Sequence, residues 1–160
     1  MADEQIATYL NDHLAGSVVA IELMEHLEAA HAGTPLERFF AELRADVMAD
    51  RKELEALMSR LGIQESGARK ATAWLTEKIT EIKLRLDDPA GGALRLLEAL
   101  EALSLGIEGK RGMCLALAAA AEVAPGLKAI DYERMKRRAE EQRQRVEEVR
   151  LHAAKAAFRA

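Results

Sequence analysis

Four titratable side chains fall on stripes of the sequence that are otherwise apolar. They are His13, Asp50, Glu101 and Glu108, and the last two are one heptad apart among leucines. An imidazole and carboxylates together are ligands that suit zinc, iron or manganese. A carboxylate without a partner is costly to bury, so a buried layer of such residues needs internal pairing, a metal ion or water.

The levels of these residues along their helices can be compared. If each helical hairpin turns at its segment of Gly and Pro, His13 lies within about one turn of Asp50, and Glu108 lies opposite Gln142. If the second and third long helices are parallel, Asp50 also comes within about one turn of Glu108. We therefore predict that His13, Asp50, Glu108 and Gln142 approach a single layer of the core.

Three interpretations of this layer remain open. The first is a structural network of histidine and carboxylates that fixes helix register, with Arg51 or Lys110 reaching in. The second is a single divalent metal ion held by His13, Asp50 and Glu108. The third is an apolar pocket with a polar end that would accept a small ligand.

Helices must position these residues, because apolar residues recur at helical spacing and hardly any stretch alternates with the period of a half-buried strand. Helices are expected at about 3–31, 35–61, 68–86, 91–123 and 131–158. Short connections containing Gly and Pro follow the first and the fourth of these, so each should form a hairpin with its successor. The sequence therefore predicts an all-α fold with two helical hairpins and a short additional crossover helix.

The helix expected over 91–123 has leucines on every side, so it should be the most buried of the five. Gly106, Gly109 and Gly112 interrupt this helix. Each glycine costs up to about 1 kcal/mol relative to alanine in a helix interior. We therefore expect close backbone packing against a neighbour, or a bend, at these positions.

Length, charge and cysteine content narrow the class of protein. A chain of 160 residues suits one domain over 1–160. The net charge of −4 provides no general attraction for nucleic acid or an anionic membrane. The N-terminus lacks the pattern of a signal peptide and no apolar run is long enough to span a bilayer, so a cytoplasmic protein is expected. Cys114 lies in an apolar stretch and should be buried as a small hydrophobe.

Two features bear on macromolecular partners. The run MKRRAEEQRQRVEEVR has Glu and Arg at the spacings of a solvated helix face, which argues against nucleic-acid binding. Phe39 and Phe40 are adjacent on a helix and must point about 100° apart. One of them should mark a second interface, with the crossover helix or with a partner subunit. A homodimer or another protein partner is thus the expected kind of contact.

Two hairpins joined by a long connection, with the second and third long helices parallel, resemble the ferritin-like four-helix-bundle superfamily. The segments YLNDHLAG, LMSRLGI and SLGIEGKRG also resemble those of uncharacterised small bacterial helical proteins, and this resemblance implies no activity. Ferritin-like metal enzymes use one Glu on each of two helices and a Glu-x-x-His pair on each of the other two. Only Glu28 with His31 has that spacing, and the second helix has no histidine, so the di-metal ligand set cannot be transferred residue by residue.

The sequence favours a ferritin-like bundle without established catalysis or cofactor, acting through protein contacts or as a structural protein. The alternative is a metal-binding bundle with oxidoreductase activity that uses His13, Asp50, Glu101 and Glu108. Both are expectations from fold and residue type, and they do not name a substrate.

Overall fold

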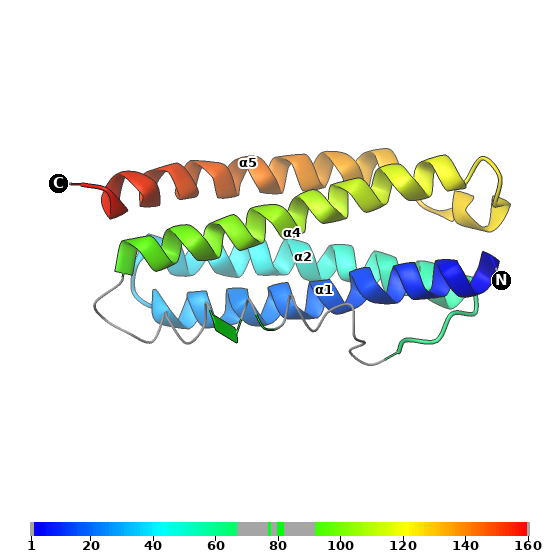
Figure 1. Ribbon diagram of the computed structural model, residues 1–160, viewed down its shortest axis with the longest axis horizontal. Coiled ribbons are helices and arrows are strands. Elements are labelled where there is room, and N and C mark those ends of the chain that lie inside the picture. The colour runs from blue at the N-terminus through cyan, green and yellow to red at the C-terminus, as the bar shows by residue number, and fades with distance from the viewer. Residues whose placement is uncertain (1, 67–76, 78–79, 82–91, 160) are drawn as a thin grey trace.

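Helices make up nearly all of the described chain (Figure 1). The computed structural model describes residues 2–66, 77, 80–81 and 92–159. The long helices are α1 (Ala2–Ala30), α2 (Pro35–Arg60), α4 (Gly92–Ala120) and α5 (Tyr132–Ala157), and the short 3-10 helix η2 (Pro125–Ala129) precedes α5. None of the helices in the described ranges is both long and apolar enough to cross a bilayer. The crossover helix predicted over 68–86 lies almost wholly outside the described residues.

The long helices pack as two hairpins, as the sequence predicted. α1 packs along α2, α4 packs along α5, and α1 also contacts α4. In Figure 1, α2 and α4 run in the same direction, and α1 and α5 run against them. A hydrogen bond from Arg60 at the end of α2 to the backbone oxygen of Ala129 in η2, 3.1 Å long, agrees with this arrangement. The chain thus folds as an all-α bundle of two hairpins.

Local sequence explains where the first hairpin turns. Gly33 adopts a φ of 78°, a left-handed conformation that side chains other than glycine rarely tolerate. Pro35 opens α2 at a position where its missing N–H is not needed. The Gly33 N–H donates to the Glu37 carboxylate over 2.7 Å, and this bond fixes the start of the helix.

The hydrophobic core is divided into two clusters along the length of the bundle. The first consists of Val19, Ile21, Leu23, Met24, Leu27, Phe40, Leu43, Val47, Leu97, Ala99, Leu100, Leu103, Ile107, Ala139, Val146 and Ala153. The second consists of Leu10, Leu14, Leu54, Leu57, Met58, Met113, Cys114, Leu117, Ala121, Leu127, Tyr132 and Met135. The change from one cluster to the other falls at Asp50 on α2, at Lys110 on α4 and at Arg138 on α5.

α4 is less buried than the sequence predicted. Leu105 is 75% exposed, and Leu94 and Leu115 are nearly half exposed. The described neighbours of α4 are α5, α1 and η2, which leave its outer side open. Among the described residues, nothing would lie within 4 Å of a Cβ atom placed on any of the three glycines in the middle of α4, so the predicted close packing is not found between the described helices.

Candidate functional site

A layer of polar side chains separates the two apolar clusters. Asp50 is 4% exposed and Gln142 is 2% exposed. The Lys110 ammonium group donates to Oδ2 of Asp50 over 2.6 Å and also donates to Oε1 of Gln142. The Gln142 amide completes the triangle by donating to the same Asp50 oxygen over 2.8 Å. The three side chains come from α2, α4 and α5, so the layer ties both hairpins together.

Arginines of α5 extend the layer toward the surface. Nη2 of Arg138 lies 3.2 Å from Oδ1 of Asp50, and its Nη1 lies 3.4 Å from Oε1 of Glu53. Glu53 also pairs with Arg134 at 2.7 Å. Asp46 and Arg145 form a further ion pair between the same two helices. Long side chains of opposite charge therefore bridge α2 and α5 over several helical turns.

The electrostatics of the layer favour a structural role. Burial lowers the pKa of the Lys110 ammonium below its usual range, while the nearby Asp50 carboxylate opposes that shift. Sliding one hairpin by a turn would place Asp50 against apolar side chains and leave it unpaired, which is costly. The layer can thus fix the axial register of the two hairpins, in the manner predicted for a network of buried polar groups.

The sequence identified part of this layer. Asp50 and Gln142 were predicted in one layer, and Lys110 was one of two basic residues predicted to reach in. The other, Arg51, pairs instead with Glu55 at 2.7 Å. Arg138 was missed, although its place three residues after the buried Met135 and four before the buried Gln142 was a signal for it. The inward position of Lys110 could be predicted from its spacing, because it lies three residues after the buried Ile107 and four before the buried Cys114.

Glu101 and Glu108 do not lie in the layer, and their predicted burial is wrong. Their side chains are 50% and 41% exposed on the outer side of α4. Glu101 pairs with Arg150 at 3.2 Å, and Glu108 pairs with Arg143 at 3.1 Å. The sequence misplaced them because leucines surround α4 on every side, so apolar spacing alone does not identify its buried face.

His13 is half-buried on α1 and forms no recorded hydrogen bond or ion pair with Asp50. Its ring meets that of Tyr9 edge-on, with centroids 4.7 Å apart. Burial lowers the pKa of His13, and the nearby Asp12 carboxylate opposes that shift. Among the described residues no three His, Cys, Asp or Glu side chains are grouped so as to hold a metal ion. The four predicted ligands, His13, Asp50, Glu101 and Glu108, are therefore not gathered into one cluster.

The Glu-x-x-His pair of α1 is occupied by other contacts. The Glu28 carboxylate pairs with Arg44 of α2 at 2.9 Å. The His31 ring lies against Phe40, with centroids 6.0 Å apart, and burial lowers the pKa of this histidine. Phe39 is partly buried on the first apolar cluster and meets Phe40 edge-on. Phe39 is thus partly covered within the bundle, and its predicted second interface with the crossover helix lies outside the described residues.

Cys114 is buried, as predicted. Burial raises the pKa of its thiol, while the Lys110 ammonium group opposes that shift. A buried thiol of raised pKa carries little thiolate, so it is a poor nucleophile. Cys114 packs among the apolar side chains of the second cluster, so its role is that of a small hydrophobic core residue.

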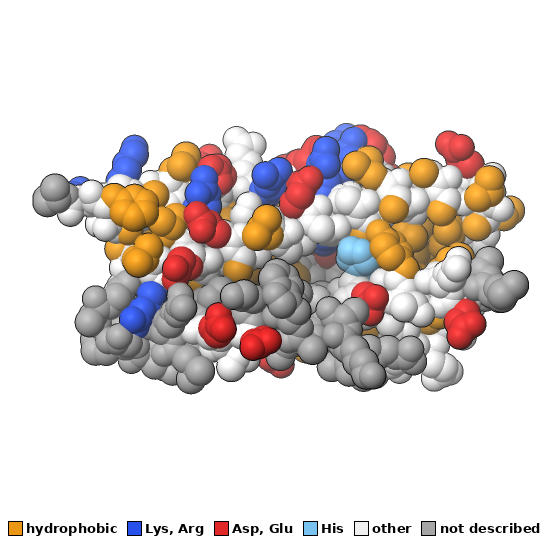
Figure 2. Space-filling view, in the orientation of Figure 1, with side chains coloured by type: hydrophobic (Ala, Val, Ile, Leu, Met, Phe, Trp, Pro, Cys, Tyr) orange, Lys and Arg blue, Asp and Glu red, His pale blue; other side chains and the backbone are white. Residues whose placement is uncertain are grey.

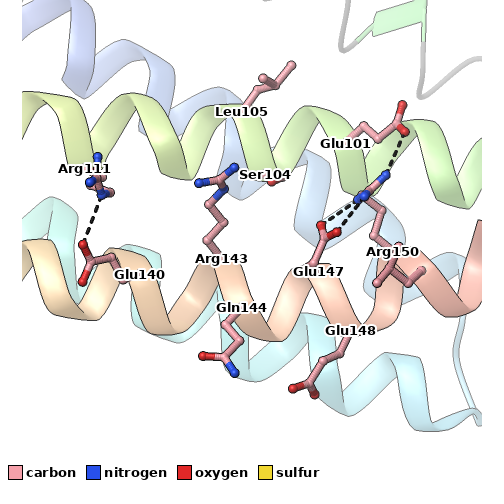
Figure 3. Close-up of a pocket in the computed structure, with 11 residues that line it drawn as sticks. Glu101, Ser104, Leu105, Arg111, Glu140, Arg143, Gln144, Glu147, Glu148 and Arg150 are labelled. Atoms are coloured by element: carbon pink, nitrogen blue, oxygen red, sulfur yellow. Dashed lines mark hydrogen bonds and ion pairs between the residues drawn. The ribbon is translucent and has the colours of Figure 1, made fainter.

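The outer surface of α4 and α5 contains a groove of about 710 Å³ (Figure 3). Arg150 lies between Glu147 and Glu101, and Arg111 of α4 points toward Glu140 at 3.1 Å. Leu105 lines the edge of the groove. Figure 2 shows acidic and basic side chains next to one another on the surface of α4 and α5. We call this surface, the groove together with the open side of α4, the α4–α5 outer face.

The described residues therefore offer two candidate sites with different chemistry. The polar layer is enclosed, and its charges are paired with one another. The α4–α5 outer face combines paired charges with open apolar positions. Neither a protein-family model, nor a curated protein, nor a solved structure matches this chain.

Proposed function

We propose that this chain is a non-enzymatic, ferritin-like helical bundle that acts through protein contacts made by its α4–α5 outer face. The observation that carries the proposal is the open side of α4. Gly106, Gly109 and Gly112 are exposed, and no described atom would lie within 4 Å of a Cβ atom at any of them; Leu105, on the same helical face as Gly112, is 75% exposed.

The glycines support a contact made by this face because no described part of the fold packs against them. Each costs up to about 1 kcal/mol relative to alanine within a helix. Alanine would fit at all three positions within the described part of the chain, since a Cβ atom there meets none of its atoms within 4 Å. The missing side chains would instead let the backbone of a partner helix approach closely. A large exposed leucine beside them supplies apolar area for such a partner to bury.

The interior supports a structural role rather than a catalytic one. Oδ2 of Asp50 accepts hydrogen bonds from Lys110 and Gln142, whereas Oδ1 has no hydrogen-bond partner and lies 3.2 Å from the Arg138 guanidinium as an ion pair. The same side chains come from three helices and separate two apolar clusters. An arrangement of this kind is suited to holding helices in one register.

The ferritin-like relationship is part of the proposal. Two hairpins with parallel α2 and α4 support it, because an up-down bundle would alternate all four directions (Figure 1). A cytoplasmic location also remains a proposal, and fractionation of the source cells would test it.

Site-specific photocrosslinking tests the proposed function. A photoreactive amino acid would replace Leu105, and a matched control would carry it at Met48, which is 40% exposed on α2. In the source cells, position 105 should yield discrete protein adducts that position 48 does not. The absence of adducts at position 105, or equal adducts at both positions, would contradict a contact through the α4–α5 outer face.

Metal binding by His13, Asp50, Glu101 and Glu108 stays a prediction with its own test. Metal analysis of protein purified without chelator, together with a thermal melt in EDTA, would decide it. Stoichiometric iron, manganese or zinc with a melting temperature lowered by EDTA would support the metal-binding alternative. Such a result would also require the outward-facing Glu101 and Glu108 to leave their arginine partners.

A further inference from the structure

We infer that the partner of the α4–α5 outer face is a second copy of this chain, bound in an antiparallel two-fold contact of α4 on α4 and α5 on α5. The inference rests on the proposed function, because it names the partner of the same face. In a two-fold contact, if one residue of the first copy meets a second residue of the other copy, then the second residue of the first copy also meets the first residue of the other.

The open side of α4 is complementary to itself in shape. Leu105 projects from it, and Gly112 and Ala116 follow on the same helical face, seven and eleven residues later. A two-fold axis level with positions 109 and 110 places Leu105 of one copy over the gap between Gly112 and Ala116 of the other. No described atom lies within 4 Å of where a Cβ of Gly112 would be, so this gap has room for a leucine side chain.

The same axis pairs opposite charges on α4. It places Glu108 of one copy opposite Arg111 of the other, and Arg111 opposite Glu108. Both side chains are accessible, at 41% and 32% exposure. Acid meets base in both directions because the two residues lie at equal distances from the axis.

The α5 helices are also complementary about this axis. The ion pairs from Arg111 to Glu140 and from Glu108 to Arg143 fix how α4 and α5 lie against each other. The axis therefore crosses α5 between Glu141 and Gln142. Glu140 of one copy then lies opposite Arg143 of the other, and Lys136 lies opposite Glu147. One axis, chosen to seat Leu105, thus also places acids opposite bases on α5.

The size of the face suits a stable contact. α4 has 29 residues and is about 43 Å long, and the two-helix layer is about 20 Å wide. Its footprint is on the order of the roughly 800 Å² per partner found in standard interfaces. The paired charges contribute mainly to register and specificity, and the seating of Leu105 supplies the apolar burial.

Sedimentation velocity and light scattering over a range of concentrations test the inference. The unmodified chain should form dimers. Leu105→Glu and Gly112→Leu should each weaken dimerisation at least tenfold, while the circular-dichroism spectrum stays that of a folded bundle. Met48→Glu, on the exposed side of α2, is the matched control and should dimerise like the unmodified chain.

A charge exchange tests the register of the contact. Glu140→Arg places like charges opposite each other in a homodimer, and so does Arg143→Glu, so each variant alone should dimerise less than the unmodified chain. An equimolar mixture of the two variants should form heterodimers, because every facing pair then carries opposite charges. Failure of the mixture to associate more tightly than either variant alone would overturn the proposed axis.

The outcomes separate this inference from the proposed function. A chain that stays monomeric at high concentration, or dimers that Leu105→Glu and Gly112→Leu do not weaken, would overturn a second copy as the partner. If the photocrosslinker at position 105 then captured a different protein, the proposed function would stand without the dimer. Absence of any adduct at position 105 together with monomeric behaviour would overturn both.

Discussion

The two sides of α4 carry charged residues of the same kinds in opposite environments. On the inward side, Lys110 pairs with Asp50, whose side chain is 4% exposed. On the outward side, Glu108 is 41% exposed and pairs with Arg111 and Arg143. Distances in both sets are those of good ion pairs, from 2.6 Å inside to 3.2 Å outside. Distance alone therefore does not tell which pair the fold depends on.

Burial decides the difference. A buried charge that loses its partner keeps its full desolvation cost, whereas an exposed charge is solvated again by water. Loss of one inward partner should therefore harm the fold, and loss of one outward partner should hardly matter. The inward side of α4 specifies how the hairpins fit together, and the outward side is free to serve a contact.

Asp50→Leu should have the largest effect. The substitution leaves the Lys110 ammonium group buried without its carboxylate, so we expect a loss of about 3–5 kcal/mol in the free energy of unfolding. Urea denaturation followed by circular dichroism measures it. The matched control is Glu42→Ala, which removes an exposed pair with Arg38 and should have no measurable effect.

Replacing both charges sharpens this result. In Asp50→Leu combined with Lys110→Met, no buried charge is left unpaired, and most of the lost stability should return. A single Asp50→Leu variant as stable as the unmodified chain would show that burial does not distinguish the two sides of α4.

Gly112→Ala tests the outward side with an effect of opposite sign. Because the added Cβ meets none of the described residues within 4 Å, the substitution should raise the free energy of unfolding by up to about 1 kcal/mol. The measurement belongs at concentrations where the chain is monomeric. Gly126→Ala is the comparison, since its Cβ would lie 3.1 Å from Cδ2 of Leu61 and should bring no such gain. A destabilised Gly112→Ala monomer would show that this side of α4 is not open.

Glu108→Gln should change the stability of the monomer by less than about 1 kcal/mol, because water solvates both arginine partners. The small effect should disappear near 1 M salt, where the screening length is about 3 Å. Urea denaturation at low and high salt measures it. A loss that persists at high salt would place Glu108 in the same class as Asp50.

Acidification extends the comparison to α1. The folded-state pKa of His13 and that of His31 are lowered by burial, so below the ordinary value of 6.5 the unfolded chain takes up protons that the folded chain resists. The free energy of unfolding should therefore fall as the pH drops from 6.5 toward the lowered values. His13→Gln should make this decline shallower, and the pH dependence that remains should come from His31. Denaturation series between about pH 5 and pH 7 would show it, and an unchanged slope in His13→Gln would contradict it.

The hairpins could be predicted because Gly and Pro mark the turns and because α2 and α5 have clear apolar stripes. Asp50 and Gln142 could be placed in one layer for the same reason, since each interrupts such a stripe. The faces of α4 could not be predicted, because its leucines surround the helix and only its contacts with α1 and α5 decide which side is buried. Glu101 and Glu108 were misplaced on that account.

The polar layer has a further consequence for how the bundle opens. Each end of the molecule has a separate apolar cluster, so thermal fluctuations can loosen one end while the other stays packed, in the manner of two foldons. Along α1 the boundary falls between Leu14 and Val19. Backbone amide protons on either side of that boundary should exchange with solvent deuterium as two groups with different protection.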